Sequence, residues 1–329
     1  MAAPLAPTPT RGPHPPEPGQ LLPDAQGGPA PVVPVALGRA KARRWSGSVP
    51  WLFLAPALAV LGTFIFYPAA RVFALSFQDY SFVSDAVWIG FRNYGRLWGD
   101  PAFRYALLNS LLYLLVTPVL IAASVSVAFL LDTGVRGIRF FRGLYFLPVV
   151  TPMIVVGILW GWLLNEDVGL VNYALLALGL VDEKVSWLTS YPLNLFSVMF
   201  VTAWKGLGYF AVIFLAGLTT IPKELEEAAA LDGASRWQQL FYVKLPLLKP
   251  SIALVAVISS ISALKVFDEL YVMIPGAPAA EKTLVPLIYQ TAFLDFRLGY
   301  ASAISVVLFL MTLAFSFLNL RFFEGKNDA

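Results

Sequence analysis

Residues 227–250 read EAAALDGASRWQQLFYVKLPLLKP, a polar, helix-forming stretch that lies between two long apolar runs. Pro222 suits the first turn of a helix, because its missing N–H needs no partner there, and the glutamates that follow place negative charge at the positive end of the helix dipole. Gly233 is able to adopt the left-handed conformation in which many helices end. The pattern predicts a short helix through the alanines that stops at Gly233.

A second short helix is predicted directly after this stop. Ser235 and Gln238 have the spacing of a capping box, and the helix should end near Leu245, because Pro246 is unable to continue it. Pro250 then opens the next apolar run. Most helix connections are about 2–8 residues long, so roughly 30 residues of capped structure exceed what a tether needs. This favours a docking element, and a well-folded connector is the alternative.

The composition of the chain places it in a membrane. Of its 329 residues, 58% are hydrophobic and 13% charged, and the mean hydropathy is +0.71. Soluble domains are about 45–50% apolar and about 25% charged. A helix that crosses a bilayer needs roughly 20 apolar residues, since all its backbone groups must be paired internally. An all-helical membrane protein is therefore predicted, with six spans near residues 50–76, 106–131, 143–164, 193–218, 251–275 and 299–320.

The basic residues predict the orientation of these spans. If the N-terminal tail is cytoplasmic, thirteen lysines and arginines fall on the cytoplasmic side and six on the opposite side. The positive-inside rule then puts both termini in the cytoplasm, and it explains the basic residues without any nucleic acid partner. The Pro-rich tail, residues 1–45, is expected to be disordered, and it contains the only histidine, His14. Residues 46–325 form the expected membrane domain.

The sequence gives no support for catalysis. It has no cysteine, no GxxxxGK[ST] phosphate loop, no histidine outside the tail and no cluster of carboxylates with metal-ligand spacing. We expect neither a metal nor a cofactor, and any ATP used in the function of this chain must be hydrolysed by another subunit.

Several parts of the chain resemble the permease subunits of ABC importers. The 221–250 loop resembles their EAA signature. The stretches WIGFRNYGRLWGDPAFRYALLNSLLYLLV and FLPVVTPMIVVGILWGWLLNEDVGLVN are similar to spans of maltose-transporter-like permeases, and the similarity covers about residues 46–325. Residues 274–278, IPGAP, depart from the usual threonine and glycine-rich turn of that family. The residues that carry the EAA resemblance are Glu227, Ala228, Ala229, Asp232, Gly233, Leu245, Pro246 and Pro250.

This resemblance implies a type I importer fold with six spans, in which the EAA helix is the coupling helix. Glu227 would face a basic residue of a cytoplasmic ATPase, Gly233 would allow a sharp turn, and Ala228 and Ala229 would allow close packing. The implied partners are two ATP-binding subunits, a second homologous permease, an extracytoplasmic solute-binding protein and the lipid bilayer. The implied location is a bacterial or archaeal cytoplasmic membrane, and the implied solute is a sugar, with glycerol phosphate as an alternative.

Polar residues inside the predicted spans are candidates for the solute pathway. Ionisable groups are costly in a bilayer and are functional candidates by default. Lys265, Asp268 and Glu269 are spaced to share one face of a continuous helix, where the lysine can neutralise one of the two carboxylates. Lys205 is then the candidate partner of the other carboxylate. A polar lock between helices is the alternative, and close packing is the alternative for the small polar residues of the second span, where Pro118 predicts a kink. The pathway candidates are Asn109, Tyr113, Trp204, Lys205, Tyr209, Asp268, Glu269 and Tyr271.

Two other classes of protein are compatible with parts of this pattern. An ion-coupled secondary transporter would use the charged residues of the fourth and fifth spans, but it would have no use for the EAA loop. A membrane scaffold would use the spans for assembly alone. Whether transport requires ATP and a co-expressed ATPase separates these classes.

Overall fold

The computed structural model describes residues 49–132 and 138–324. Internal contacts divide the chain after Pro56, and the larger unit, residues 57–329, holds every element described below except the first part of α1 (Val49–Leu61). The predicted tail, residues 1–45, lies outside the described residues, as do its basic residues and His14. The regular structure of the described residues is helical apart from β1 (Gln78–Asp79) and β2 (Val87–Trp88), which pair antiparallel with Gln78 opposite Trp88.

Four helices among the described residues are long and apolar enough to cross a membrane. They are Trp51–Leu75, which includes α2 (Tyr67–Leu75) after the π-turn η1 (Gly62–Phe66), then Pro101–Asp132, α9 (Leu193–Thr219), and Leu298–Phe323 within α16 (Leu298–Glu324). A fifth span results if Arg236–Leu247 and Lys249–Leu264, which meet at 67°, count as one. These helices correspond to the first, second, fourth and sixth predicted runs, and in part to the fifth.

The kink in the second of these helices is where the sequence predicts it. α4 (Pro101–Tyr113) and α5 (Val116–Asp132) are separated at residues 114–115, one turn before Pro118. Pro118 has no N–H to donate to the carbonyl of Leu114. The N–H of Thr117 takes that carbonyl instead, at 3.0 Å. The carbonyls of Leu111, Leu112 and Leu114 in this turn are therefore all paired.

Two of the predicted runs are not continuous helices, so the prediction was wrong in this respect. The run 143–164 is divided into α6 (Ile138–Val150) and α7 (Met153–Leu163) by Thr151 and Pro152, whose ψ of 140° is extended. The run 251–275 is divided into α13 (Lys249–Leu264) and α14 (Asp268–Met273), with Phe267 at φ −140° and ψ −59°. The first break follows from a proline. The second contains neither proline nor glycine, so the sequence gives no local signal for it.

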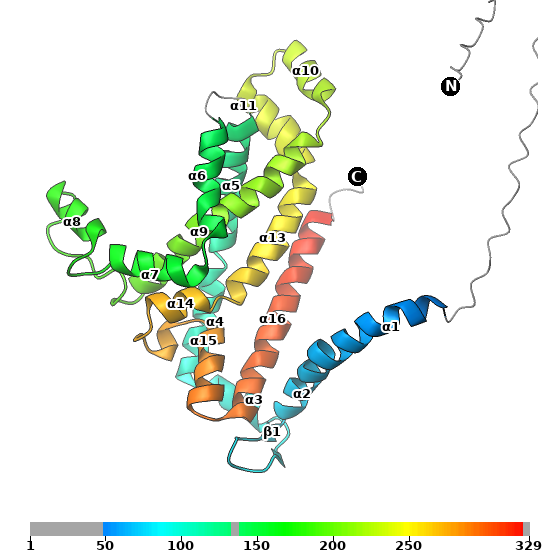
Figure 1. The fold of residues 1–329 in the computed structure, drawn as a ribbon, viewed down its shortest axis with the longest axis vertical. Helices are drawn as coiled ribbons and strands as arrows, with labels where there is room; N and C mark the ends of the chain where they lie inside the picture. The colour runs from blue at the N-terminus through cyan, green and yellow to red at the C-terminus, as the bar shows by residue number, and fades with distance from the viewer. Residues whose placement is uncertain (1–48, 133–137, 325–329) are drawn as a thin grey trace, which may run out of the picture. The chain divides into compact units, whose positions relative to one another are not determined.

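α9 packs closely against three neighbouring helices in the larger unit (Figure 1). Its glycines make this possible, because a Cβ on Gly206, Gly208 or Gly217 would press on Leu120 of α5, on Tyr145 of α6 or on Ser251 of α13. The hydroxyl of Ser124 in α5 also donates to the carbonyl of Leu207 at 3.2 Å. Small residues and interhelical hydrogen bonds are the main means of helix association in lipid, where burial of apolar surface gives no advantage.

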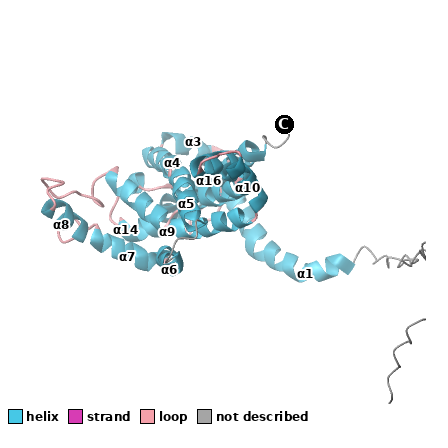
Figure 2. Cartoon of the chain, turned by 90° about the horizontal axis from the view of Figure 1, so that it is seen from above, coloured by secondary structure: helices cyan, strands magenta, loops and turns pink. Residues whose placement is uncertain are grey.

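The two ends of this unit carry different structures (Figure 1). One end holds α10 (Lys223–Leu231), and the opposite end holds β1 and α3 (Arg92–Gly99). At that end Asn93 donates to the carbonyls of Ser76 and Gln78, at 3.0 and 2.9 Å, and the N–H of Gly299 donates to Tyr80 at 3.0 Å. Seen from above, α7 and α8 (Leu170–Ala177) extend away from the bundle of α4, α5, α9 and α16 (Figure 2).

We predict that Gly208→Ala lowers the stability of the protein. The added Cβ would collide with the carbonyl oxygen of Tyr145 and meet Val149 at 2.9 Å, and overpacking of this kind costs about 1–3 kcal/mol. The measurement is the midpoint of thermal unfolding in detergent.

Gly161→Ala in α7 is the matched control, because no atom lies within 4 Å of its Cβ position. It should be neutral or slightly stabilising, as alanine favours a helix by about 0.5–1 kcal/mol over glycine. Equal midpoints for the two variants would show that the contact of α6 with α9 is not close-packed.

Candidate functional site

The 221–250 loop is a series of short, capped helices. α10 is followed by α11 (Arg236–Gln239), a π-turn η2 (Leu240–Lys244) and α12 (Leu245–Leu247). The predicted capping box is present: the N–H of Ser235 donates to Oε1 of Gln238 at 2.7 Å, and the N–H of Gln238 donates to Oγ of Ser235 at 3.3 Å. Gly233 has φ +81°, the left-handed conformation expected of it. Pro222 caps α10 and does not lie within its first turn.

The second helix of this loop extends beyond its predicted end near Leu245. It continues to Leu247, and the position of Pro246 is accommodated by η2, in which the N–H of Leu245 donates to the carbonyl of Leu240 five residues earlier. A π-turn is wider than an α-turn, so it relieves the clash that a proline ring makes inside a regular helix. The sequence contains no obvious signal for this turn, and the predicted end was wrong by two residues.

Apolar side chains stand out into solvent along the loop. Leu231 is 89% exposed, Trp237 71% and Tyr242 79%, and the Trp237 ring stacks on Phe241 at 6.2 Å. No side chain of α10 is buried. Large exposed apolar groups gathered in one place are typical of a surface that binds another protein. Of the predicted coupling residues, Glu227, Ala228, Asp232, Gly233 and Pro246 are exposed, and Ala229 and Leu245 are half-buried.

One lysine ties this loop to the end of α5. Nζ of Lys244 lies 2.8 Å from Oδ2 of Asp132 and 2.9 Å from Oε2 of Glu226. Burial lowers the pKa of Lys244, but the hydrogen bonds and charges of Asp132 and Glu226 outweigh burial, so the pKa lies above its ordinary value. The ammonium is therefore charged at any physiological pH. We call these three residues the Lys244 bridge; the sequence analysis missed it because Asp132 is 112 residues away.

Two pathway candidates of the second span form bonds between elements of the protein. Nδ2 of Asn109 donates to the carbonyls of Ala280 and Lys282, at 3.0 and 3.2 Å, and its Oδ1 accepts from Tyr191 at 3.1 Å. Tyr113 is fully buried, and its hydroxyl lies 2.6 Å from that of Thr202. For both residues these contacts favour a structural role, in line with the close-packing alternative given for the second span, over contact with a solute.

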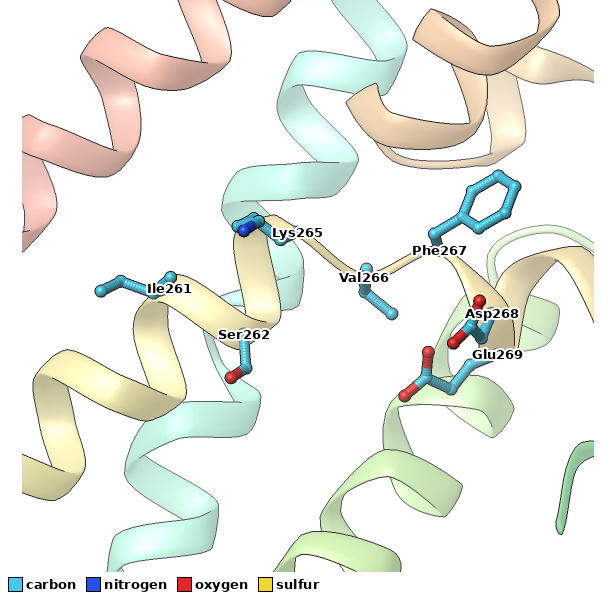
Figure 3. Close-up of a pocket in the computed structure, with 7 residues that line it drawn as sticks. All are labelled: Ile261, Ser262, Lys265, Val266, Phe267, Asp268 and Glu269. Atoms are coloured by element: carbon cyan, nitrogen blue, oxygen red, sulfur yellow. The ribbon is translucent and has the colours of Figure 1, made fainter. Parts of the chain in front are cut away.

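The candidates of the fifth run line a hollow at the break between α13 and α14 (Figure 3). Its volume is about 450 Å³. Lys265 lies at the end of α13, and the carboxylates of Asp268 and Glu269 lie beyond an extended segment, so the three do not share one helix face and that prediction was wrong. Among the described residues, neither Lys265 nor Lys205 forms an ion pair within 4.0 Å. The lining residues are Ile261, Ser262, Lys265, Val266, Phe267, Asp268 and Glu269.

A cluster of aromatic rings adjoins this hollow. Phe267, which lines it, stacks on Tyr271 at 5.2 Å with 26° between the planes. Tyr289 contacts both rings, at 5.3 and 5.6 Å, and Phe293 lies 5.4 Å from Tyr289. The last two belong to α15 (Leu284–Tyr289) and η4 (Gln290–Leu294), and the sequence analysis did not single them out. Their spacing of four residues was the available signal.

The other pathway candidates lie on α9. Trp204 packs edge-to-face on Trp160 at 5.4 Å, and Tyr209 packs on its neighbour Phe210. Trp204 and Tyr209 are 37% and 48% exposed, so part of each side chain stays accessible. Lys205 is half-buried, and its charge attracts the Glu269 carboxylate from beyond ion-pair distance.

A polar network organises the segment between α7 and α9. Ser186 and then Thr189 donate hydrogen bonds to Glu166, at 2.6 and 2.8 Å, and these bonds hold the pKa of its carboxyl below the usual value. The amide of Asn172 donates to the carbonyls of Glu166 and Val185, at 3.1 and 3.0 Å. These bonds fold the segment without a large apolar core.

Comparison with known proteins decides the family. Residues 121–324 match the model of the binding-protein-dependent transport system inner membrane component. A probable ABC transporter permease, YurN of Bacillus subtilis, is 38% identical over 286 residues, which cover 85% of this chain and 98% of YurN. The chain belongs to the binding-protein-dependent ABC transporter permeases. It is thus a multi-pass inner membrane protein and a non-catalytic component of an importer.

Other relatives of this permease agree over nearly their full lengths. The lactose permease LacF of Rhizobium radiobacter is 32% identical, covering 85% of this chain and 95% of LacF. The trehalose/maltose permease MalF of Thermococcus litoralis is 30% identical, covering 84% and 94%. A bacterial alginate ABC transporter, solved in complex with a periplasmic protein, has the same fold, with a TM-score of 0.73 at 21% identity over 83% of this chain and 93% of that one.

We predict that Asn109→Ala destabilises the permease and leaves its affinity for solute nearly unchanged. The substitution removes the donor of two backbone carbonyls, and a buried polar group without a partner costs about 1–3 kcal/mol. The thermal midpoint should fall in the variant.

Ser126→Ala, in the same bundle, is the control, since that hydroxyl is exposed and, within the part of the chain that the structure describes, bonds to Ala122 of its own helix alone. A loss of solute affinity at unchanged stability in Asn109→Ala would instead place Asn109 in the pathway.

Proposed function

We propose that this permease forms half of the membrane pathway for a sugar and couples its import to ATP hydrolysis by a separate subunit. The support for a sugar comes from relatives named for lactose, trehalose/maltose and arabinooligosaccharide transport, which are 30–34% identical over more than four fifths of this chain. The support for coupling comes from the rigid, exposed 221–250 loop.

The proposed topology has six spans with both termini in the cytoplasm. Four helices are long enough to cross alone, and the broken pairs α6–α7 and α13–α14 would complete the set. The distribution of lysines and arginines in the sequence supports this orientation. In it, the 221–250 loop faces the cytoplasm and the segment between α7 and α9 faces outward. The predicted domain boundaries, a tail at 1–45 and a membrane domain at 46–325, are part of this proposal.

The 221–250 loop is the single observation that carries the coupling function. A coupling element must be stiff, because a flexible loop would absorb the displacement of its partner before the spans moved. Here the capping box, the left-handed Gly233 and the π-turn fix the path of the chain. α10 would dock in a groove of the ATPase with Glu227 opposite a basic residue, and Trp237 and Tyr242 would enlarge the apolar contact. Two ATPase subunits, a second permease and a binding protein would complete the importer.

The hollow at the break of α13 offers the chemistry that a sugar needs. Asp268 and Glu269 accept hydrogen bonds from hydroxyls, Lys265 donates them, and the ring of Phe267, on which Tyr271 stacks, offers an apolar surface to a pyranose ring. Trp204, Lys205 and Tyr209 on α9 would continue the pathway. The pair of carboxylates disfavours glycerol phosphate, since two negative groups would repel its phosphate.

Reconstitution in proteoliposomes tests this function. The permease, its partner subunits and its binding protein should import sugar only when ATP is supplied on the side of the membrane that carries the ATPase subunits. The chain has no cysteine, so single cysteines at Ala229 or Ser235 give unambiguous cross-links. Capture of the ATPase from these positions supports the coupling role. A complex that imports sugar but never cross-links there, or one driven by an ion gradient without ATP, contradicts it.

We predict that Gly233→Val uncouples transport while membrane insertion stays normal. A β-branched residue at φ +81° costs about 1–2 kcal/mol, so the turn would adopt another geometry and α10 would dock poorly. Uptake should fall about tenfold, the factor that 1.4 kcal/mol gives. Glu227→Lys should act similarly by charge repulsion.

Gly276→Val is the matched control, because Gly276 has open space around it and no left-handed backbone. If Gly233→Val imports sugar and stimulates the ATPase at the normal rate, the loop is not the coupling element.

We predict that Asp268→Asn weakens binding of the sugar without loss of complex. The amide keeps the size of the side chain and removes a charged acceptor, and such hydrogen bonds contribute about 1.5–3 kcal/mol. The half-saturation concentration for uptake should rise about tenfold, within the range that this energy allows. Asp295→Asn, an exposed residue outside the hollow, should have no effect. A lower yield of assembled complex with unchanged affinity would indicate a structural role for Asp268.

A further inference from the structure

The Lys244 bridge connects two parts of the permease that the chain itself does not join directly. Asp132 is the last residue of α5, Glu226 lies within α10, and Lys244 ends η2. The lysine side chain is 13% exposed, against 31% and 33% for the two carboxylates. A single half-enclosed ammonium thus holds two carboxylates, each at less than 3 Å.

α10 depends on this bridge for its position. None of its side chains is buried, and its main contacts are with the neighbouring α11 and η2. Within the described ranges, 49–132 and 138–324, Lys244 makes the only ion pair or side-chain hydrogen bond that reaches α10. The other constraints on α10 are its covalent links through Pro222 to α9 and through Gly233 to α11, its contacts with α11 and η2, and backbone hydrogen bonds such as that from the N–H of Ala234 to the carbonyl of Ala229 at 3.0 Å.

α5 is in turn fixed to α9 along much of its length. Ser124 donates to the carbonyl of Leu207, and Leu120 packs tightly against Gly206, where an added Cβ would lie 3.3 Å from it. One turn before α5, Tyr113 bonds to Thr202. A displacement that reaches the end of α5 would therefore move α5 and α9 together.

We propose that Lys244 is a positioning residue that transmits the displacement of α10 to α5. Through the chain alone, α10 acts on α9 and, by way of α11 and α12, on α13. The Lys244 bridge adds α5, so all three helices of the core would move as one body. This inference rests on the proposed coupling function. It adds α5 to α9 and α13 as a third helix through which motion of α10 enters the membrane domain.

The energetics of the site favour such a role. An isolated exposed ion pair contributes little, but breaking a partly buried pair leaves charge without a partner. Without Lys244, Asp132 and Glu226 would face each other as two uncompensated carboxylates and would repel. α10 would then move away from α5, and motion of the ATPase would enter the core through α9 and α13 alone, with no direct push on the end of α5.

The test measures sugar imported per ATP hydrolysed, in proteoliposomes that hold the complete importer. Lys244→Met keeps the length of the side chain and removes its charge. This ratio should fall by about fivefold or more, the lower end of typical coupling between sites, with ATPase activity and complex yield maintained. The control is Lys184→Met, which breaks an exposed ion pair with Asp167 at the outer segment and should leave the ratio unchanged.

A charge-inverted variant tests whether the ion pairs of Lys244 with Asp132 and Glu226, and not another property of the lysine, are responsible for coupling. In the triple variant Asp132→Lys, Glu226→Lys, Lys244→Glu, one carboxylate stands between two ammonium groups, and the ratio should return close to that of the wild type. The proposal is overturned if Lys244→Met keeps the normal ratio, or if the inverted variant is as uncoupled as Lys244→Met. If Lys244→Met does not assemble, the inverted variant must still assemble and transport, and its failure also overturns the proposal.

These outcomes are distinct from a failure of the proposed function. If the wild-type complex shows no ATP-dependent uptake, the coupling function itself is wrong. If the wild type is coupled and both variants match it, only the role of the Lys244 bridge is wrong.

Discussion

The backbone of a membrane helix must find its hydrogen-bond partners inside the protein, and this requirement explains how the permease tolerates interrupted helices. Each interruption has a nearby donor or acceptor. At the kink before Pro118, the N–H of Thr117 takes the carbonyl of Leu114. At the break after α13, the hydroxyl of Thr283 donates to the carbonyl of Val266 at 3.4 Å. The segment that supplies Thr283 is itself held by the amide of Asn109. The interrupted helices and the side-chain hydrogen bonds that hold neighbouring segments in place therefore depend on each other.

The break between α13 and α14 places irregular backbone beside polar side chains that line a hollow. A continuous α13–α14 helix would have bonded its own carbonyls and presented Lys265, Asp268 and Glu269 in a stripe. The break instead opens a hollow with carboxylates at one side and a lysine at the other. Irregular backbone at membrane depth is tolerated only where it is buried in protein or lines a cavity. α13 thus connects the capped helices of the 221–250 loop at one end with the irregular backbone of the hollow at the other.

The sequence predicted the features of this fold that depend on local physics. The long apolar helices, the kink near Pro118, the capping box of Ser235 and the left-handed Gly233 each follow from residues within a few positions of each other. Features that depend on distant contacts were not predicted. The break at Val266 has no proline or glycine, the Lys244 bridge joins residues 112 positions apart, and the ring of Tyr289 meets Tyr271 only in the folded chain. Asn109 was identified as a special residue, but its partners were identified only in the structure.

The exposed apolar side chains of the 221–250 loop affect how long an unassembled permease subunit persists in the cell. Leu231, Trp237 and Tyr242 offer the kind of surface that chaperones and quality-control proteases recognise. A copy made in excess of its ATPase would keep that surface uncovered, whereas an assembled copy would hide it. The residues proposed to bind the ATPase would then also mark unassembled subunits for removal, so the cell would balance the amounts of the two proteins by degradation as well as by synthesis.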